Sequence, residues 1–204
     1  MARMSSVAVL QTRMVNELTG CPELLRVEAL RDALRQFCEE SNAWHETLSD
    51  IDIEDGVVEY NLIPEYDAHI QRIVAVRLNT EDGVTDDVWP DPLDESLYSM
   101  TPGDPEVLVL DDSLEPADDI TGALRVKASF VPEFNSLDIA EWFLNRYWEG
   151  IVARAMGIRM RDPNKRWTNA MRAEFYERDY RDRLQRAKAE VSRQFKEAAF
   201  TMPM

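Results

Sequence analysis

The spacing of apolar residues changes twice along this chain, and that change constrains the fold more than any other feature. Apolar residues recur every three or four positions near the start, alternate between about residues 47 and 132, and return to three- and four-residue spacing afterwards. The pattern predicts an α+β protein. Helices from residues 1–46 and 133–204 would form a bundle, and residues 47–132 would form a small inserted antiparallel β subdomain.

Two helices are expected before residue 46. In the second, an apolar stripe has charged and polar residues between its members, and Pro22 suits the first turn. The stripe consists of Val27, Leu30, Leu34, Phe37 and Cys38. An earlier helix is indicated by Val7, Leu10, Met14 and Leu18, with Gly20 placed to end it.

The alternating region predicts short strands. Leu48, Ile51 and Ile53 precede Asp55-Gly56, a two-residue hairpin signal, so residues 57–62 should return as the paired strand. Further strands are expected at 70–78, 107–110 and 123–131.

One segment of this region, residues 79–122, is acidic and rich in proline. It holds 14 acidic residues, no basic residue and five of the ten prolines, so we expect long exposed loops there rather than core strands. The segment is interpreted as a solvated surface or, alternatively, as an acidic surface that repels DNA or docks on a basic partner.

Two more helices are expected after residue 133. The first would be capped by Asn135 or Ser136 and closed near Gly157. Its stripe is Leu137, Ala140, Leu144, Tyr147, Ile151 and Ala155, and Trp142, Phe143 and Trp148 widen it. A face this broad indicates burial by the core or, less commonly, by a neighbouring subunit.

A long helix should follow from about Trp167 to Ala198. Its stripe is Trp167, Met171, Phe175 or Tyr176, Tyr180, Leu184, Ala187, Val191 and Phe195. Its opposite face carries four acid-first pairs at i,i+4 spacing: Glu174/Arg178, Glu177/Arg181, Asp179/Arg183 and Asp182/Arg186. These pairs make a self-supporting solvated helix face at least as good an interpretation as a nucleic-acid patch.

Charge argues against several classes of function. The net charge is −16, with −20 in residues 1–136 and +4 in residues 137–204, so generic nucleic-acid binding by the whole molecule is disfavoured. The longest uncharged stretch, residues 4–12, is too short to cross a bilayer or to act as a secretory signal, so we expect synthesis in the cytoplasm and no membrane partner.

Motifs for catalysis or cofactor binding are not found in the sequence. The seven scattered glycines form no phosphate-binding loop, and His45 lacks the second histidine of a zinc-protease motif. Residues 50–61 differ from a calcium loop in the position of glycine and at position twelve, which is Asn61. Cys21 and Cys38 are expected to be reduced. We therefore expect no catalytic residue, cofactor or metal.

In two segments, residues 33–48 with Phe37-Cys38 and Trp44, and residues 149–167 with the long helix after them, the chain resembles the head-to-tail adaptor (connector or neck) proteins of tailed bacteriophages. The first is Ala33–Leu48, a helix that passes through Phe37-Cys38 into Trp44 and then a strand. The second runs from Glu149-Gly150-Ile151 through Asp162-Pro163-Asn164-Lys165-Arg166-Trp167 into the long helix. With the neighbouring strands they cover about half of the chain, and the acidic middle has no counterpart in the resemblance.

The resemblance implies a virion structural protein of the neck between capsid and tail. Such adaptors form a ring, usually of twelve copies, under the portal protein, extend the DNA channel and offer a platform for the tail. DNA would pass without specific binding. The implied candidates for contacts with the portal or with neighbouring copies are Trp142, Trp148, Arg172, Arg178, Arg183, Phe195, Phe200, Met202 and Met204.

Acidic side chains that face such a channel would keep DNA from adhering. The candidates are Asp50, Asp52, Glu54, Asp86, Asp87, Asp111 and Asp112. Alternatives remain open at this point. They are another neck or tail-completion protein, an acidic regulatory protein that mimics DNA and, as the weakest hypothesis, an enzyme.

Overall fold

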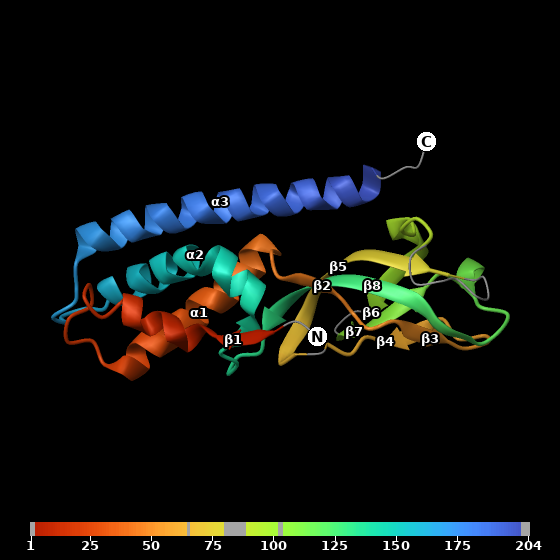
Figure 1. Cartoon of the computed structure of the whole chain (residues 1–204), viewed down its shortest axis with the longest axis horizontal. Coiled ribbons are helices and arrows are strands. Elements are labelled where there is room, and N and C mark those ends of the chain that lie inside the picture. The colour runs from red at the N-terminus through yellow and green to blue at the C-terminus, as the bar shows by residue number, and fades with distance from the viewer. Residues whose placement is uncertain (1–2, 65, 80–88, 102–103, 201–204) are drawn as a thin grey trace. The chain divides into compact units, whose positions relative to one another are not determined.

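The computed structural model describes residues 3–64, 66–79, 89–101 and 104–200, and it combines helices with antiparallel sheets (Figure 1). The chain divides into two compact units. The helical unit comprises Met1–Trp44 and Val131–Arg193, and the sheet unit comprises His45–Phe130 and the residues from Gln194 onward. Within the described residues, no helix is both long enough and apolar enough to span a bilayer.

The helical unit begins with a short strand rather than with the first expected helix. Strand β1 (Met4–Ser6) pairs antiparallel with β9 (Asp138–Ala140), and a 3₁₀ helix, η1 (Val7–Arg13), follows it. The side chain of Ser6 caps η1 by accepting a hydrogen bond from the backbone N–H of Ala8. Met14 and Leu18 are fully buried, as their apolar spacing predicts, but they lie in turns after η1.

Helix α1 (Glu23–Ser41) confirms the second expected helix. Leu30, Leu34, Phe37 and Cys38 are buried along one face. The helix ends where Asn42 adopts a left-handed conformation, with φ of 53°, and donates its backbone N–H to the carbonyl of Cys38.

Helix α2 (Glu141–Met160) begins later and ends later than the sequence predicts. The expected caps Asn135 and Ser136 precede β9, because the backbone of Asp138–Ala140 is used in pairing with β1. Gly157 lies inside the helix rather than at its end. A Cβ atom at Gly157 would lie 3.7 Å from the carbonyl oxygen of Ala173, an ordinary contact distance, so the packing at this position does not itself require glycine.

Helix α3 (Ala170–Phe200) runs antiparallel alongside α2 (Figure 1). Its first turn is capped by the side chain of Asn169, which accepts from the backbone N–H of Arg172. The predicted positions Tyr180, Leu184, Ala187 and Val191 are buried. Of the four predicted ion pairs, Glu177/Arg181 and Asp179/Arg183 form, whereas Glu174/Arg178 and Asp182/Arg186 are not among the ion pairs of the described residues.

The sheet unit contains two sheets. In one, the long strand β8 (Ile120–Pro132) pairs with β2 (His45–Thr47), β3 (Ile51–Ile53) and β5 (Ala68–Leu78). In the other, β7 (Asp104–Leu110) lies between β4 (Glu59–Asn61) and β6 (Tyr98–Thr101). Two 3₁₀ helices, η2 (Glu95–Leu97) and η3 (Asp112–Leu114), complete the unit.

The predicted hairpin at Asp55-Gly56 is wrong. A turn forms there, with Gly56 at φ of 69°, but β3 pairs with β8 and β4 pairs with β7, so the flanking strands join different sheets. The partner of each flanking strand is a longer strand, β8 or β7. The turn instead binds the loop after η3, where the N–H of Gly56 donates to the carbonyl of Pro116.

The expectation of exposed loops throughout residues 79–122 is also wrong in part. The strand expected at 107–110 is confirmed, because it is part of β7 (104–110), where Leu108 and Leu110 are buried. Residues 98–101 and 104–106, which were expected to be loop, form β6 and the start of β7. Pro105 does not prevent this pairing, because the register shifts between Met100 and Thr101 and the irregularity falls at its position in β7.

Candidate functional site

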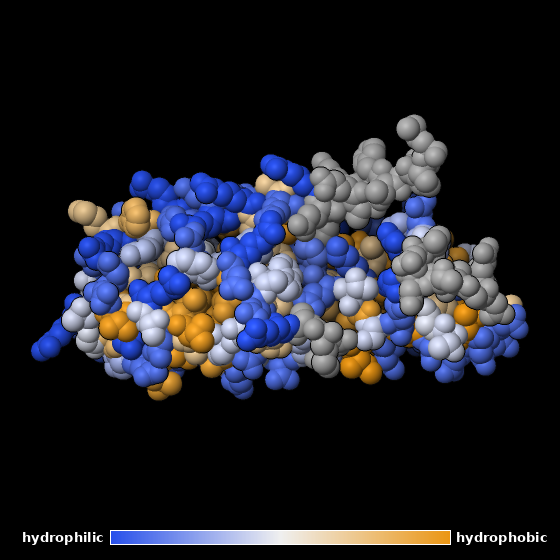
Figure 2. Space-filling view, in the orientation of Figure 1, coloured by the Kyte–Doolittle hydropathy of each residue, from blue (hydrophilic) through white to orange (hydrophobic). Residues whose placement is uncertain are grey.

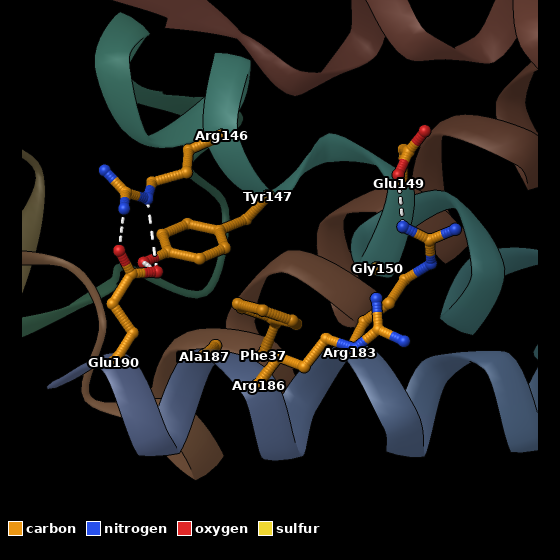
Figure 3. Close-up of a pocket in the computed structure, with 9 residues that line it drawn as sticks. All are labelled: Phe37, Arg146, Tyr147, Glu149, Gly150, Arg183, Arg186, Ala187 and Glu190. Atoms are coloured by element: carbon orange, nitrogen blue, oxygen red, sulfur yellow. Dashed lines mark hydrogen bonds and ion pairs between the residues drawn. The ribbon is translucent and has the colours of Figure 1, made fainter. Parts of the chain in front are cut away.

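A pocket of about 180 Å³ lies within the helical unit where α1, α2 and α3 meet (Figure 3). Helix α1 contributes one aromatic residue, and α2 and α3 contribute the charged groups. The lining residues are Phe37, Arg146, Tyr147, Glu149, Gly150, Arg183, Arg186, Ala187 and Glu190. We call this the arginine pocket.

Phe37 forms the apolar floor of the arginine pocket. Its ring centroid lies 5.5 Å from that of Tyr147, 6.1 Å from that of Phe143 and 6.3 Å from that of Tyr180. A Cβ atom at Gly150 would lie 2.8 Å from this ring. Glycine at position 150 therefore allows α2 to approach α1 closely enough for the aromatic cluster to pack.

Two of the three lining arginines are held by acidic neighbours (Figure 3). Arg146 forms an ion pair with Glu190, which also accepts a hydrogen bond of 3.1 Å from the hydroxyl of Tyr147. Arg183 donates from Nε to Asp179 at 3.0 Å and from Nη1 to Glu149. These contacts fix both guanidinium groups at the rim of the pocket.

Arg186 differs from the other two arginines. It is exposed, lines the pocket and forms no ion pair within the described residues. In Figure 3 its side chain lies on the same side of the pocket as that of Arg183, whereas Arg146 and Tyr147 lie at the other end. Among the described residues, Arg186 is thus the lining cation whose charge is not matched by an acidic neighbour.

The environment of the pocket maintains these charge states. Burial raises the pKa of the Tyr147 hydroxyl, which therefore stays protonated and able to donate to Glu190 near neutral pH. Burial acts to lower the pKa of Arg183, but hydrogen bonds and the charges of Asp179 and Glu149 outweigh it and raise the pKa.

The chemistry of the arginine pocket favours recognition of a carboxylate. Guanidinium groups are planar donors that match carboxylate oxygens, and the residues around them supply neither a thiol nor an imidazole. Within the described part of the chain, no group of three or more His, Cys, Asp or Glu side chains could hold a metal ion.

A second surface feature is a set of exposed apolar side chains near the starts of α1 and α3, namely Val15, Leu24, Met171 and Phe175, which we call the apolar end. These side chains are 43%, 69%, 82% and 62% exposed. The starts of α1 and α3 and the end of α2 meet at this end, where Arg159 of α2 donates to the carbonyl of Leu25 at 2.7 Å. An ion pair of Arg172 with Glu17 joins α3 to the segment that contains Val15.

Figure 2 shows apolar side chains over the part of the helical unit that holds η1 and α1, whereas hydrophilic side chains predominate along α3. Met171 and Phe175 are exceptions on α3 because both are exposed and lie one turn apart. Apolar side chains that gather on a surface indicate a protein contact.

The candidates for portal or subunit contacts do not form one cluster. Trp142 is 39% exposed, and Trp148 is half-buried beneath Arg13, whose guanidinium carbon lies 4.0 Å from the ring centroid. Arg172 belongs to the apolar end and Arg183 to the arginine pocket, whereas Arg178 is exposed on α3. Phe195 and Phe200 lie on α3, and Met202 and Met204 lie outside the described residues.

The acidic candidates divide into structural and solvent-facing residues. Asp50 accepts two hydrogen bonds of 2.7 and 2.6 Å from Arg125, and Asp52 accepts one of 2.7 Å from the N–H of Gly122. Asp111 accepts hydrogen bonds from the hydroxyl and from the backbone N–H of Ser113, which lower the pKa of its carboxyl, and the second of these bonds caps η3. Glu54 and Asp112 are exposed, and Asp86 and Asp87 lie outside the described residues.

The sequence did not predict that the residues of the arginine pocket lie close together. Of its nine residues, only Arg183 was a candidate for contact. The i,i+4 pattern placed Arg186 opposite Asp182, but the residues that surround it come from helices far apart in sequence.

Comparison with known proteins adds no identification: no family model matches this chain, and no curated protein matches it.

Proposed function

We propose that this chain is a structural protein of a tailed-phage virion, a head-to-tail adaptor that binds the portal protein and assembles as a ring in the neck. Helices from both ends of the chain would form a bundle from which the sheet unit extends the DNA channel and offers the platform for the tail. The sequence resemblance motivates this proposal, and the role it assigns is structural rather than catalytic.

The observation that carries the proposal is the apolar end. It holds four of the eight large apolar residues that are prominently exposed among the described residues. Hydrophobic side chains left in water at one end of a helical unit are typical of a surface that a protein partner covers. The portal is the partner that an adaptor would meet with such a surface.

The two units differ in net charge, which supports a different role for each of them in the proposed function. The helical unit has 18 basic and 16 acidic residues, whereas residues 45–130 have 4 basic and 22 acidic residues. A nearly neutral unit with exposed apolar side chains suits protein contact, and a strongly acidic unit suits a surface past which DNA moves without adhering.

Sedimentation velocity of the purified chain, alone and with the portal ring from the same genome, tests the proposal. We expect saturable binding at one copy per portal subunit. An absence of binding at micromolar concentrations would contradict the portal-adaptor role. Electron-microscopic labelling that places the chain on the tail side would then favour a tail-completion protein.

Replacing both Met171 and Phe175 by serine should weaken portal binding by roughly a hundredfold, because about 1.5 kcal/mol or more of apolar burial is lost at each position. The same titration of the portal ring measures the loss. The matched control is Ile63→Ser, which removes a side chain that is 80% exposed in the sheet unit and should leave binding unchanged. Equal effects of the two variants would exclude the apolar end as the docking surface.

Acidic residues of the sheet unit are expected to ease DNA passage. We expect DNA ejection to slow when Glu54, Asp86 and Asp87 are replaced together by amides, while the ring still assembles, because fewer negative charges repel the phosphate backbone. This set omits Asp50, Asp52 and Asp111, whose carboxylates bind Arg125 or the backbone. Ejection kinetics from particles that carry the variant measure the effect, and an unchanged rate would contradict channel lining.

The acidity of residues 45–130 also favours a second candidate, a regulatory protein that mimics DNA. That function predicts a monomer or dimer that competes with DNA for an enzyme. A competition assay with duplex DNA distinguishes it from an adaptor, which requires portal binding.

A further inference from the structure

The charge of Arg186 is unusual among the arginines of the arginine pocket. Arg146 and Arg183 are paired with Glu190, Asp179 and Glu149, but Arg186 has no acidic partner among the described residues. It lines the arginine pocket together with the apolar residues Phe37, Gly150 and Ala187. A carboxylate that enters from outside would therefore meet a guanidinium with all of its donors available.

Groups next to Arg186 are positioned to help bind such a carboxylate. Arg183 uses Nε and Nη1 for its own pairs and retains further N–H groups, and Asp179 and Glu149 limit its motion. Because a rigid donor loses less entropy on binding than a free side chain, the pocket is partly preorganised for an anionic group.

This chain carries a complementary surface of its own. The loop that begins at η3 holds five acidic residues between 111 and 119 and no basic one. Asp111 and Asp119 accept hydrogen bonds from the backbone N–H groups of Ser113 and Asp55. The other three, Asp112, Glu115 and Asp118, are exposed and form no ion pair within the described residues.

We propose that the arginine pocket binds the carboxylates of Asp112, Glu115 and Asp118 from a second copy of this chain. The proposal rests on charge complementarity between Arg186 and the acids of this loop, none of which has an ion pair within the described residues. The contact joins two different surfaces, so it repeats from copy to copy and closes into a ring where the rotation permits. It deepens the proposed adaptor function, on which it rests, by naming the contact between ring neighbours.

Two charge-reversed variants of the full chain test the contact. The first carries Arg186→Glu, and the second carries Asp112→Lys, Glu115→Lys and Asp118→Lys. Each alone brings like charges together, so self-association measured by sedimentation velocity at low salt should weaken by roughly tenfold or more relative to the wild type. Mixed in equal amounts, the two variants present complementary charges at every contact, and association should return.

A matched control is Arg193→Glu, which reverses an exposed arginine of α3 that lies outside the pocket and forms no ion pair within the described residues, and which should leave self-association unchanged. The proposal is overturned where the mixture associates no better than either variant, or where Arg193→Glu weakens association as much as Arg186→Glu. It is also overturned where the wild type stays monomeric up to its highest soluble concentration. Portal binding, measured separately, shows whether the adaptor function itself survives that result.

Discussion

Phe37→Ala is expected to lower the free energy of unfolding by about 3–5 kcal/mol, the range for truncating a buried phenylalanine. The Phe37 side chain is 1% exposed and contacts the rings of Phe143 and Tyr147 on α2 and Tyr180 on α3. Truncation therefore removes one contact surface from three helices at once. The cavity that truncation leaves cannot close easily, because ion pairs between Arg154 and Glu177 and between Arg183 and Glu149 also join α2 to α3.

Chemical denaturation of the full chain, followed by far-ultraviolet circular dichroism, measures the loss. Phe175→Ala is the matched control, since it truncates the same side chain where it is 62% exposed, and it should change the free energy of unfolding by no more than about 0.5 kcal/mol. Similar losses in the two variants would show that the four rings of Phe37, Phe143, Tyr147 and Tyr180 are not the centre of the helical core.

Glu177→Ala is expected to cost roughly 2–3 kcal/mol, the range for losing hydrogen bonds to charged groups. Glu177 lies 2.6 Å from Arg154, 3.3 Å from Arg161 and 3.3 Å from Arg181, and its side chain is only 14% exposed. Arg154 is 18% exposed, so its charge would remain largely out of water without a carboxylate. The partial exposure of this pair keeps the expected cost below that of a fully buried one.

Glu174→Ala provides the control for Glu177→Ala. It removes a glutamate of the same helix that is exposed and has no ion pair within the described residues, and it should leave the denaturation midpoint nearly unchanged. Equal midpoints for the two variants would mean that solvent compensates Arg154 after the carboxylate is lost.

Helices were the most predictable elements because apolar spacing reports directly on a buried face. Leu30, Leu34, Phe37 and Cys38 of α1, and Tyr180, Leu184, Ala187 and Val191 of α3, are buried as predicted, whereas Val27 of α1 is only half-buried. In the stripe of α3, Met171 was wrongly included, and of the two alternatives Phe175 is exposed and Tyr176 is half-buried. At 3.6 residues per turn, Met171 lies about 180° around the helix from Tyr180, so the face that buries Tyr180 leaves Met171 in water.

Strand pairing was less predictable, because the partner of a strand is chosen by the tertiary structure and not by the nearest turn. The strands that flank Asp55-Gly56, β3 and β4, have only three residues each. Each of them pairs with a longer strand, β3 with β8 and β4 with β7, and not with the other. Similarly, proline density in residues 79–122 suggested loops, but a local irregularity in register accommodates Pro105 within β7.

The arginine pocket was not predictable from local sequence. Helical spacing identified the charged face of α3, and it correctly paired Asp179 with Arg183. Whether a neighbouring helix supplies a second acid depends on how α2 and α3 pack. Glu149 and Glu190 pair across those helices, whereas no acid reaches Arg186 within the described residues. The packing of α2 against α3 therefore determines that Arg186, and not Arg146 or Arg183, remains available to bind an anion.

The order of segments along the chain has a consequence for biosynthesis. Helix α1 ends at Ser41, and its packing partner α2 begins at Glu141, about one hundred residues later. At translation rates of roughly 5–20 residues per second, the apolar face of α1 waits several seconds or longer for that partner to be made. The continuous segment 45–130 can fold in the interval. Nascent chains that stall before α2 would therefore expose Leu30, Leu34 and Phe37, a surface that molecular chaperones recognise.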